Sequence, residues 1–223
     1  MDDSLTPFSE IDLSERGWYR FSRDIMTMVS AIPNLSRARL HKSLDEMLQA
    51  GTDQQPWFNE YKQRQKIVLT VGIPGSGKST FAERLQEQSG WVRVNQDELG
   101  TRRAVEVRME AALKQGLSVI VDRTNFDYQQ RNNWVKMAAQ YRINTIFCVL
   151  FDIDAAVCKS RISVRKNHPT IPEGDSGHVI VDKFTTMLVP PRRGEGFCEI
   201  FTVRTDDDIA RVMQLLTSLA PKH

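Results

Sequence analysis

A glycine-rich segment in the first half of the chain has the residue types that bind phosphate. Residues 72–80 read Gly-Ile-Pro-Gly-Ser-Gly-Lys-Ser-Thr, which fits the pattern G-x-x-x-x-G-K-[ST] in full. Glycines at this spacing let backbone N–H groups converge on phosphate oxygens at the start of a helix. The lysine can reach the β- and γ-phosphates, and the serine hydroxyl can ligate Mg²⁺. We therefore expect a nucleoside triphosphate with Mg²⁺, ATP or alternatively GTP, to bind through Gly75, Ser76, Gly77, Lys78, Ser79 and Thr80.

Two carboxylates follow the next two apolar runs of the chain. Transfer of a phosphoryl group to an alcohol needs a group that accepts the hydroxyl proton, and Asp97 is the candidate for this general base. Its alternative role is to cap the N-terminus of the following helix. Asp122 is expected to hold Lys78 or a magnesium-bound water. After it, Thr124 and Asn125 are either contacts to the acceptor or simple turn and capping residues.

Three arginines are candidates for contacts with phosphates. Arg161 and Arg165 lie four residues apart, hence on one face of a predicted helix. Together they can clamp the β- and γ-phosphates and stabilise the charge in transfer, and the alternative is a solvated helix face. The breaker-rich stretch 166–174 that follows suits a mobile lid. Arg131 is either a contact to the substrate or an exposed surface arginine.

These residues need a framework to position them, and the chain from residue 66 onward alternates between strands and helices. Apolar runs predict buried strands at 67–73, 91–94, 118–121, 145–151 and 199–203. Helices are expected at 78–88, 101–115, 127–140, 154–166 and 207–219. Such alternation predicts an α/β fold, a parallel sheet with helices on both faces. Functional groups of such sheets gather at the carboxyl ends of the strands, which is where the candidates above lie.

Residues 1–60 are predicted to form an N-terminal helical extension that precedes a P-loop domain at 61–223. Apolar residues recur at three- and four-residue steps from Trp18 to Ile32, and a second helix is expected from Ser36 to Ala50. The polar stretch 51–56 is typical of a connector. The apolar stripes are expected to pack on each other or on the following domain, and docking of a protein partner is the alternative.

Charge and composition narrow the class of protein. The net charge of +2 is uneven: residues 1–60 hold 6 basic and 10 acidic side chains, which leaves 24 and 18 for the remainder. A modestly basic domain suits a phosphate-bearing ligand and permits a polynucleotide substrate without arguing for one. No apolar run is long enough to predict a membrane span, and no secretory signal is expected. The three cysteines are odd in number and lack the paired spacing of a zinc site. Cys148 lies in an apolar run, which predicts a buried reduced thiol and favours a reducing, intracellular compartment, cytoplasm or nucleus.

From about residue 66 to 205 the chain resembles the polynucleotide 5′-hydroxyl kinases. The resemblance runs in order through the motifs Gly72–Thr80, Val94–Asp97, Ala112–Gly116, Asp122–Asn125, Arg131, Phe151–Asp152, Arg161 with Arg165, and Glu195–Phe197. It implies a P-loop kinase-like fold, a general base at Asp97, a lid carrying the ATP-binding arginines Arg161 and Arg165, and a substrate end bound near Asp122–Asn125. The chain departs from the phage member of the family, which has an arginine at the position of Gly100. Arg102 or Arg103 is the candidate replacement.

These observations lead to one functional hypothesis and two alternatives. The first is an ATP-dependent polynucleotide kinase that transfers the γ-phosphate to a 5′-hydroxyl end of RNA or DNA with Mg²⁺. Its predicted catalytic residues are Lys78, Asp97, Arg161 and Arg165, and its predicted acceptor residues are Asp97, Arg102, Asp122, Thr124, Asn125 and Arg131. The second is a kinase of the same fold that acts on a small metabolite, a nucleotide sugar or an aminoacyl-tRNA. The third is a non-catalytic nucleotide-binding module.

Overall fold

The computed structural model describes residues 65–164 and 175–220, which belong to a unit spanning Lys62–His223. The predicted N-terminal helices, the boundary at residue 60, Arg165 and the predicted lid segment 166–174 lie outside the described residues and stay predictions.

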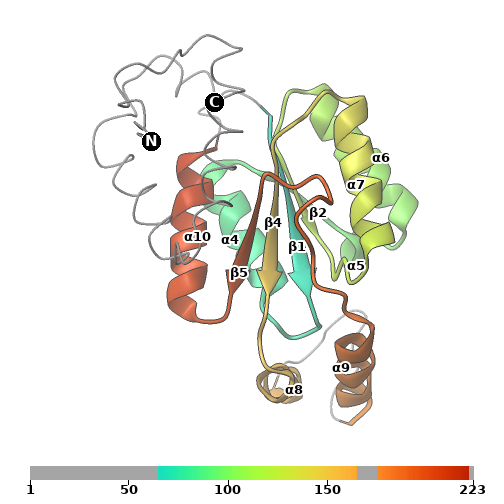
Figure 1. Cartoon of the computed structure of the whole chain (residues 1–223), viewed down its shortest axis with the longest axis vertical. Helices are drawn as coiled ribbons and strands as arrows, with labels where there is room; N and C mark the ends of the chain where they lie inside the picture. Colours follow the sequence, from blue (N-terminus) through green and yellow to red (C-terminus); the bar gives the residue numbers. More distant parts are fainter. Residues whose placement is uncertain (1–64, 165–174, 221–223) are drawn as a thin grey trace, which may run out of the picture. The chain divides into compact units, whose positions relative to one another are not determined.

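The described residues are built around a parallel five-stranded sheet with the strand order β2-β3-β1-β4-β5 (Figure 1). The strands are β1 (Ile67–Gly72), β2 (Val92–Asn95), β3 (Val119–Asp122), β4 (Ile146–Phe151) and β5 (Glu199–Val203). Every residue of β1 and β3 is buried, as expected for strands that are covered on both faces. The central strand β1 lies at the point where the strand order reverses, and ligands of parallel sheets bind outside the carboxyl ends at such a point.

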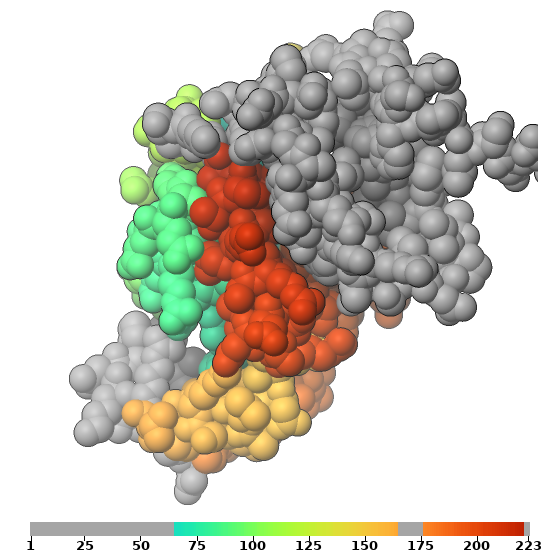
Figure 2. Space-filling model, turned by 90° about the vertical axis from the view of Figure 1, so that its left-hand side faces the viewer, coloured from blue at the N-terminus to red at the C-terminus, as the bar shows by residue number. Residues whose placement is uncertain are grey.

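Helices cover both faces of this sheet. They are α4 (Lys78–Ser89), α5 (Gln96–Leu99), α6 (Arg102–Lys114), α7 (Tyr128–Gln140), α8 (Ala155–Val164), α9 (Asp175–Met187) and α10 (Asp206–Ser218). Figure 1 shows α6 and α7 on one side of the sheet, α4 and α10 on the other, and α8 with α9 beyond the carboxyl ends of the strands. Figure 2 shows α4 beside α10 on one face of the molecule. The predicted α/β fold is therefore confirmed.

Two apolar clusters hold these layers together. The larger one joins alternate residues of the strands, such as Ile67 and Leu69, to Val105 and Met109 of α6 and Trp134 of α7. All five of these side chains are at most 1% exposed, so the burial of their apolar surface is a main source of stability. The smaller cluster packs α8 and α9 against Ile73 at the start of the glycine-rich loop. It therefore helps to fix the position of that loop.

The strands and the five longer helices predicted from the sequence are all present, with ends shifted by one or two residues. Two helices were not expected. The four-residue helix α5 begins after Asn95, whose side chain caps it by accepting a hydrogen bond from Glu98 N. The sequence of α9 is rich in β-branched residues, which have low helix propensity. Val181 and Phe184 of α9, together with Leu188 just after it, pack into the smaller cluster, and this tertiary packing outweighs the propensity.

Among the described residues, no helix combines the length and apolar composition needed to cross a membrane.

Candidate functional site

The glycine-rich loop lies between β1 and α4, in the context that its pattern requires. Gly77 caps α4 with a positive φ of 100°, which costs a glycine little. Gly75 has a φ of 81°, and a Cβ atom there would lie 2.6 Å from the backbone oxygen of Cys158 on α8. Only glycine fits this close approach. The loop is therefore held between its own helix and α8, with the N-terminal N–H groups of α4 facing the cleft described below.

Lys78 lies folded over the loop. Its ammonium group donates hydrogen bonds to Ile73 O at 2.8 Å and to Ser76 Oγ at 3.3 Å. The side chain is 7% exposed and opens onto the cleft. A cation held here sits beside the converging N–H groups, where it can neutralise phosphate oxygens.

Asp122, at the end of β3, is the centre of a polar network. One of its carboxylate oxygens accepts a hydrogen bond from Ser79 Oγ at 3.2 Å. The other accepts from Asn95 Nδ2 at 2.6 Å and from Arg93 Nε at 2.9 Å. The β2–β3 register, which pairs Asn95 with Asp122, brings these groups together. Because the carboxylate is 2% exposed, these partners offset its cost of burial.

Arg93 is a member of this network that the sequence analysis missed. Its side chain is 9% exposed and pairs with three carboxylates, Asp122 at 2.8 Å, Glu98 at 2.6 Å and Glu83 at 3.4 Å. Burial lowers the pKa of the Arg93 guanidinium, but the pairs with Glu98 and Asp122 outweigh it and raise this pKa above its ordinary value. The sequence contains a sign of this role, an arginine inside the apolar run 91–94. A charged side chain within a buried strand needs a partner of opposite charge.

Asp97 lies in the first turn of α5 and is exposed at the cleft. The alternative role as a helix cap is wrong, because Asn95 caps α5 and Thr101 caps α6. Burial lowers the pKa of the nearby Arg123 guanidinium, and the charge of Asp97 partly opposes this shift. The assignment of Asp97 as a general base stays a prediction.

The turn after β3 is fixed to β1 by its backbone and by Asn125. Gly72 N donates to Thr124 O at 3.2 Å, and Thr70 Oγ1 donates to Arg123 O at 3.1 Å. Asn125 adopts a φ of 44°, which asparagine tolerates better than most residues. Thr124 lines the cleft.

The predicted acceptor contacts of Asn125 and Arg131 need correction, because both side chains are fully buried. The Asn125 amide donates to Thr70 O at 2.8 Å and accepts from Trp134 Nε1 at 2.9 Å. Arg131 is not an exposed surface arginine either, since it forms two hydrogen bonds with Glu195, at 2.6 and 2.8 Å. Its Nη1 donates to Asn125 O at 3.1 Å and to Val189 O at 2.9 Å. Both side chains thus form their hydrogen bonds with other parts of the protein, and they hold the turn in place from the buried side.

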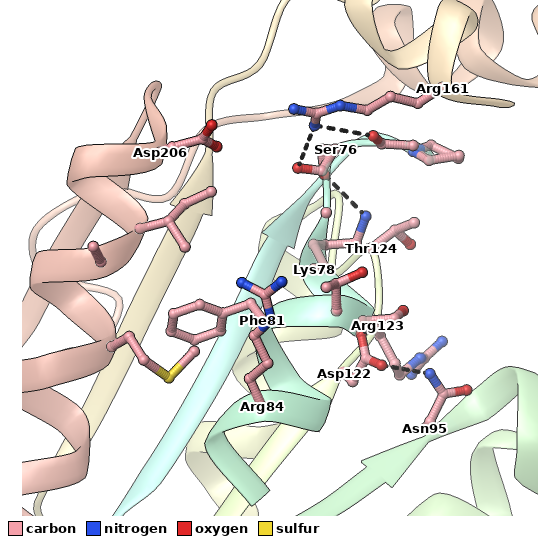
Figure 3. Close-up of a pocket in the computed structure, with 18 of the residues that line it drawn as sticks. Ser76, Lys78, Phe81, Arg84, Asn95, Asp122, Arg123, Thr124, Arg161 and Asp206 are labelled. Carbon is pink, nitrogen blue, oxygen red and sulfur yellow. Dashed lines mark hydrogen bonds between the residues drawn. The ribbon is translucent and has the colours of Figure 1, made fainter. Parts of the chain in front are cut away.

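Arg161 and Arg102 occupy different surroundings. Arg161 extends from α8 over the loop, where Nη1 donates to Ser76 O at 3.4 Å and approaches Gly75 O at 3.5 Å (Figure 3). It lines the cleft, so its predicted role as a phosphate contact remains open to test. Arg102 lies outside the cleft lining and pairs with Glu106 at 2.7 Å.

A cleft of about 1220 Å³ joins these groups. The close-up view (Figure 3) shows Arg161 and Asp206 along one part of its rim and Arg123 with Asn95 along another, with Lys78 between them. The Ser79 hydroxyl and the Asp122 oxygen that it contacts are hard oxygen donors of the kind that suit Mg²⁺. No cluster of three metal-ligating side chains occurs within the described part of the chain, and Mg²⁺ at phosphates commonly uses only one or two protein ligands.

Comparison with known families gives a match to the family described as AAA domain over residues 67–110 and 99–180. Together the two segments span just over half of the chain. The chain belongs to the AAA-domain family. The matched segments contain the loop, Asp97, Asp122 and Arg161, so the nucleotide-binding character of the predicted P-loop is confirmed.

The relatives of this AAA-domain protein include kinases. It is 31% identical over 149 residues to the bifunctional polynucleotide phosphatase/kinase of Schizosaccharomyces pombe, covering 65% of this chain and 35% of that protein. It is 30% identical over 168 residues to Arabidopsis thaliana transcription factor bHLH140, covering 72% of this chain and 18% of that protein. This chain therefore spans about a third or less of either relative.

A solved structure of a fungal RNA kinase has the same fold as this AAA-domain protein. It matches with a TM-score of 0.54 and 13% identity over 69% of this chain and 86% of that one. This likeness shows the shared fold. The identity to the Schizosaccharomyces pombe enzyme, together with the family match, confirms the resemblance to polynucleotide kinases and the phosphotransferase class at the level of the family.

Proposed function

We propose that this chain is a polynucleotide kinase, which transfers the γ-phosphoryl group of ATP to a 5′-hydroxyl end of RNA or DNA. The observation that carries the proposal is that the glycine-rich loop and Asp97 open on one cleft. A phosphate donor and a proton-accepting carboxylate can therefore act on the same reacting atoms. The class of acceptor, a polynucleotide, is inferred from the names of the relatives.

The donor binds on the side of the loop. Backbone N–H groups at the start of α4 bind the phosphate oxygens, and Lys78 moves from its contacts with Ile73 and Ser76 to the β- and γ-phosphates. Arg161 already reaches the loop backbone from α8, so its guanidinium lies beside the proposed position of the triphosphate. These cations stabilise the charge that spreads over the γ-phosphoryl oxygens during transfer.

Magnesium is expected at Ser79, with Asp122 holding one of its waters. When bound there, Mg²⁺ would neutralise charge on the phosphate oxygens. Arg93 and Asn95 donate to one oxygen of Asp122, and Ser79 donates to the other, which would be the oxygen available to hold the metal's water. Groups that fix a ligand in this way determine metal affinity nearly as strongly as the ligands themselves.

The acceptor hydroxyl is expected beside Asp97. The carboxylate lies at the carboxyl end of β2, two strands away from the loop that follows β1, so the attacking oxygen approaches from the side opposite Arg161. Asp97 accepts the hydroxyl proton and orients the oxygen in line with the bond that breaks between the γ-phosphorus and the bridging oxygen of ADP.

Lys78→Ala should lower kcat for this transfer by about 10²–10³-fold, the usual loss for one preorganised electrostatic group. The assay follows γ-labelled phosphate from ATP with Mg²⁺ to 5′-hydroxyl RNA and DNA oligonucleotides. The control is Lys136→Ala on α7, a lysine outside the cleft lining. Wild-type protein that binds ATP yet labels neither oligonucleotide would contradict a polynucleotide acceptor and point to a small-molecule acceptor. Full activity in Lys78→Ala would contradict the site itself.

A further inference from the structure

Arg93 is a largely buried cation in the edge strand β2, and its side chain connects three separate elements of the site. Side chains of a strand alternate between the two faces of the sheet. Val94 packs with α6 and α7 in the larger cluster. Arg93 and Asn95 therefore lie on the opposite face, which α4 covers (Figure 1). Both donate to Asp122 of the neighbouring strand, which places them beside the glycine-rich loop's helix.

The guanidinium of Arg93 bridges Asp122 and α5. Its Nε and Nη2 atoms lie 2.9 and 2.8 Å from the same oxygen of Asp122. Another edge of the group presents Nη1 to Glu98 Oε1 at 2.6 Å. Because a guanidinium is a rigid plane with donors on more than one edge, it fixes the separation of the two carboxylates that it joins. A lysine ammonium is a point charge on a flexible stem and does not fix this separation.

Helix α5 depends on this bridge for its orientation. It is a single turn of four residues, and a helix so short has no stability of its own in water. Asn95 fixes its start, because the side chain accepts from Glu98 N at 3.1 Å and donates to Asp122 at 2.6 Å. Arg93 holds the same glutamate through its carboxylate. Two residues of β2 thus attach α5 to Asp122, one through the backbone and one through a side chain.

The position of Asp97 follows from that of α5, because Asp97 immediately precedes Glu98 in this turn. Asp97, Asp122 and Ser79 all line the cleft, and Ser79 Oγ donates to Asp122 at 3.2 Å. The bridge therefore joins the carboxylate on the proposed acceptor side to the residues of the proposed magnesium side. Such positioning matters for a rate, because a displacement of about 1 Å can lower it by about 10²-fold.

We propose that Arg93 is a positioning residue, which holds α5 through Glu98 and thereby keeps Asp97 at a fixed distance from Asp122 across the cleft. This proposal rests on the proposed polynucleotide kinase function, with Asp97 as its base. The third partner of Arg93 is Glu83, at 3.4 Å, which belongs to α4 and lies outside the cleft lining. Glu83 balances charge but does not hold α5.

The test removes the link to α5 and leaves Arg93 with Asp122. The Glu98 side chain is 60% exposed and alanine favours a helix, so Glu98→Ala should fold normally. Its kcat for transfer of labelled γ-phosphate to a 5′-hydroxyl oligonucleotide should fall about tenfold, less than the loss for a full 1 Å displacement. The KM for ATP should not change, because the phosphates bind at the glycine-rich loop. The matched control, Glu83→Ala, removes a partner of the same guanidinium that is 51% exposed and should keep the wild-type kcat.

A double-mutant cycle shows whether the effect passes through Asp97. Glu98→Ala should cause no further loss of kcat in an Asp97→Asn background, because the base is already absent. Glu98→Gln should retain most of the wild-type rate, since its amide oxygen still accepts from Arg93. Arg93→Lys keeps a positive charge beside Asp122 without the planar bridge, so it should lose about as much rate as Glu98→Ala.

The outcomes separate this proposal from the one on which it rests. A wild-type kcat in Glu98→Ala or in Arg93→Lys overturns the positioning role and leaves the polynucleotide kinase in place. An equal loss in Glu83→Ala, or a further loss in the Asp97→Asn background, also overturns it, since either result shows a general structural effect. Absence of transfer by wild-type protein overturns both proposals. If Arg93→Lys fails to fold, the comparison of Glu98→Ala with Glu98→Gln decides.

Discussion

Arg131→Leu should lower the free energy of unfolding by about 3–5 kcal/mol, because it leaves a carboxylate buried without its partner. The arginine is fully buried and Glu195 is 8% exposed, with a separation of 2.6 Å between Nε and Oε2. The substitution also removes the donors to Asn125 O and Val189 O, so two backbone carbonyls lose a partner. Denaturant unfolding of the purified protein measures the change.

The matched control for this prediction is an exposed ion pair of the same chemistry. Arg204 and Asp152 lie 2.8 Å apart, but their side chains are 63% and 52% exposed. Arg204→Leu should therefore change the free energy of unfolding by less than about 1 kcal/mol. The double variant Arg131→Leu with Glu195→Leu should recover much of the loss, since it removes both charges. If Arg131→Leu and Arg204→Leu lower the free energy of unfolding by similar amounts, the buried pair contributes no more to stability than the exposed one, which contradicts the prediction.

Asp97→Asn should lower kcat for phosphoryl transfer by at least about 10²-fold, the lower part of the range for a general base. Asparagine preserves the shape of the side chain but cannot accept the proton. Because the side chain is exposed and Asn95 provides the cap of α5, stability should change little. Nucleotide binding should be unaffected, because the proposed function places the phosphates at the glycine-rich loop and not at Asp97.

Two measurements distinguish this outcome from general damage to the site. Nucleotide titration should give the same Kd for Asp97→Asn as for wild-type protein. Glu87→Gln, an exposed acidic residue of α4 outside the cleft lining, should retain full activity. If the rate of Asp97→Asn is within a few-fold of the wild-type rate, another group or solvent accepts the hydroxyl proton, and the assignment of Asp97 is wrong.

Much of the fold could be predicted because its signals are local. The glycine-rich loop is a contiguous pattern, and the strands are short apolar runs bounded by polar residues. The position of Asp97 and Asp122 at one edge of the sheet followed from the parallel arrangement of the strands alone. Helix α9 escaped prediction because its helical state depends on packing against α8, a tertiary effect that overrides propensity.

The burial of Arg131 could not be predicted for a different reason. Its carboxylate partner is 64 residues further along the chain, and nothing in the sequence near Arg131 indicates which acidic residue will reach it. The same holds for Arg93, whose partners Glu83, Glu98 and Asp122 come from three separate elements. Motif spacing identifies groups that follow neighbouring strands, but it does not identify which charges the fold brings into contact.

The turn after β3 is connected through protein contacts to α9, and α9 is connected to α8. Val189, just after α9, donates from its N–H to Phe126 O at 2.7 Å and accepts from Arg131, while α9 is tied to α8 by Lys159 and Asp182 at 2.7 Å. The helix that carries Arg161 and the turn that carries Thr124, one of the predicted acceptor residues, are therefore linked through protein contacts. Under the proposed function, we expect that ordering one of them for its substrate also orders the other, so that the second substrate binds more tightly. Donor and acceptor should thus show positive synergy in a random-order mechanism, each raising the affinity of the other by the same factor, as linkage requires.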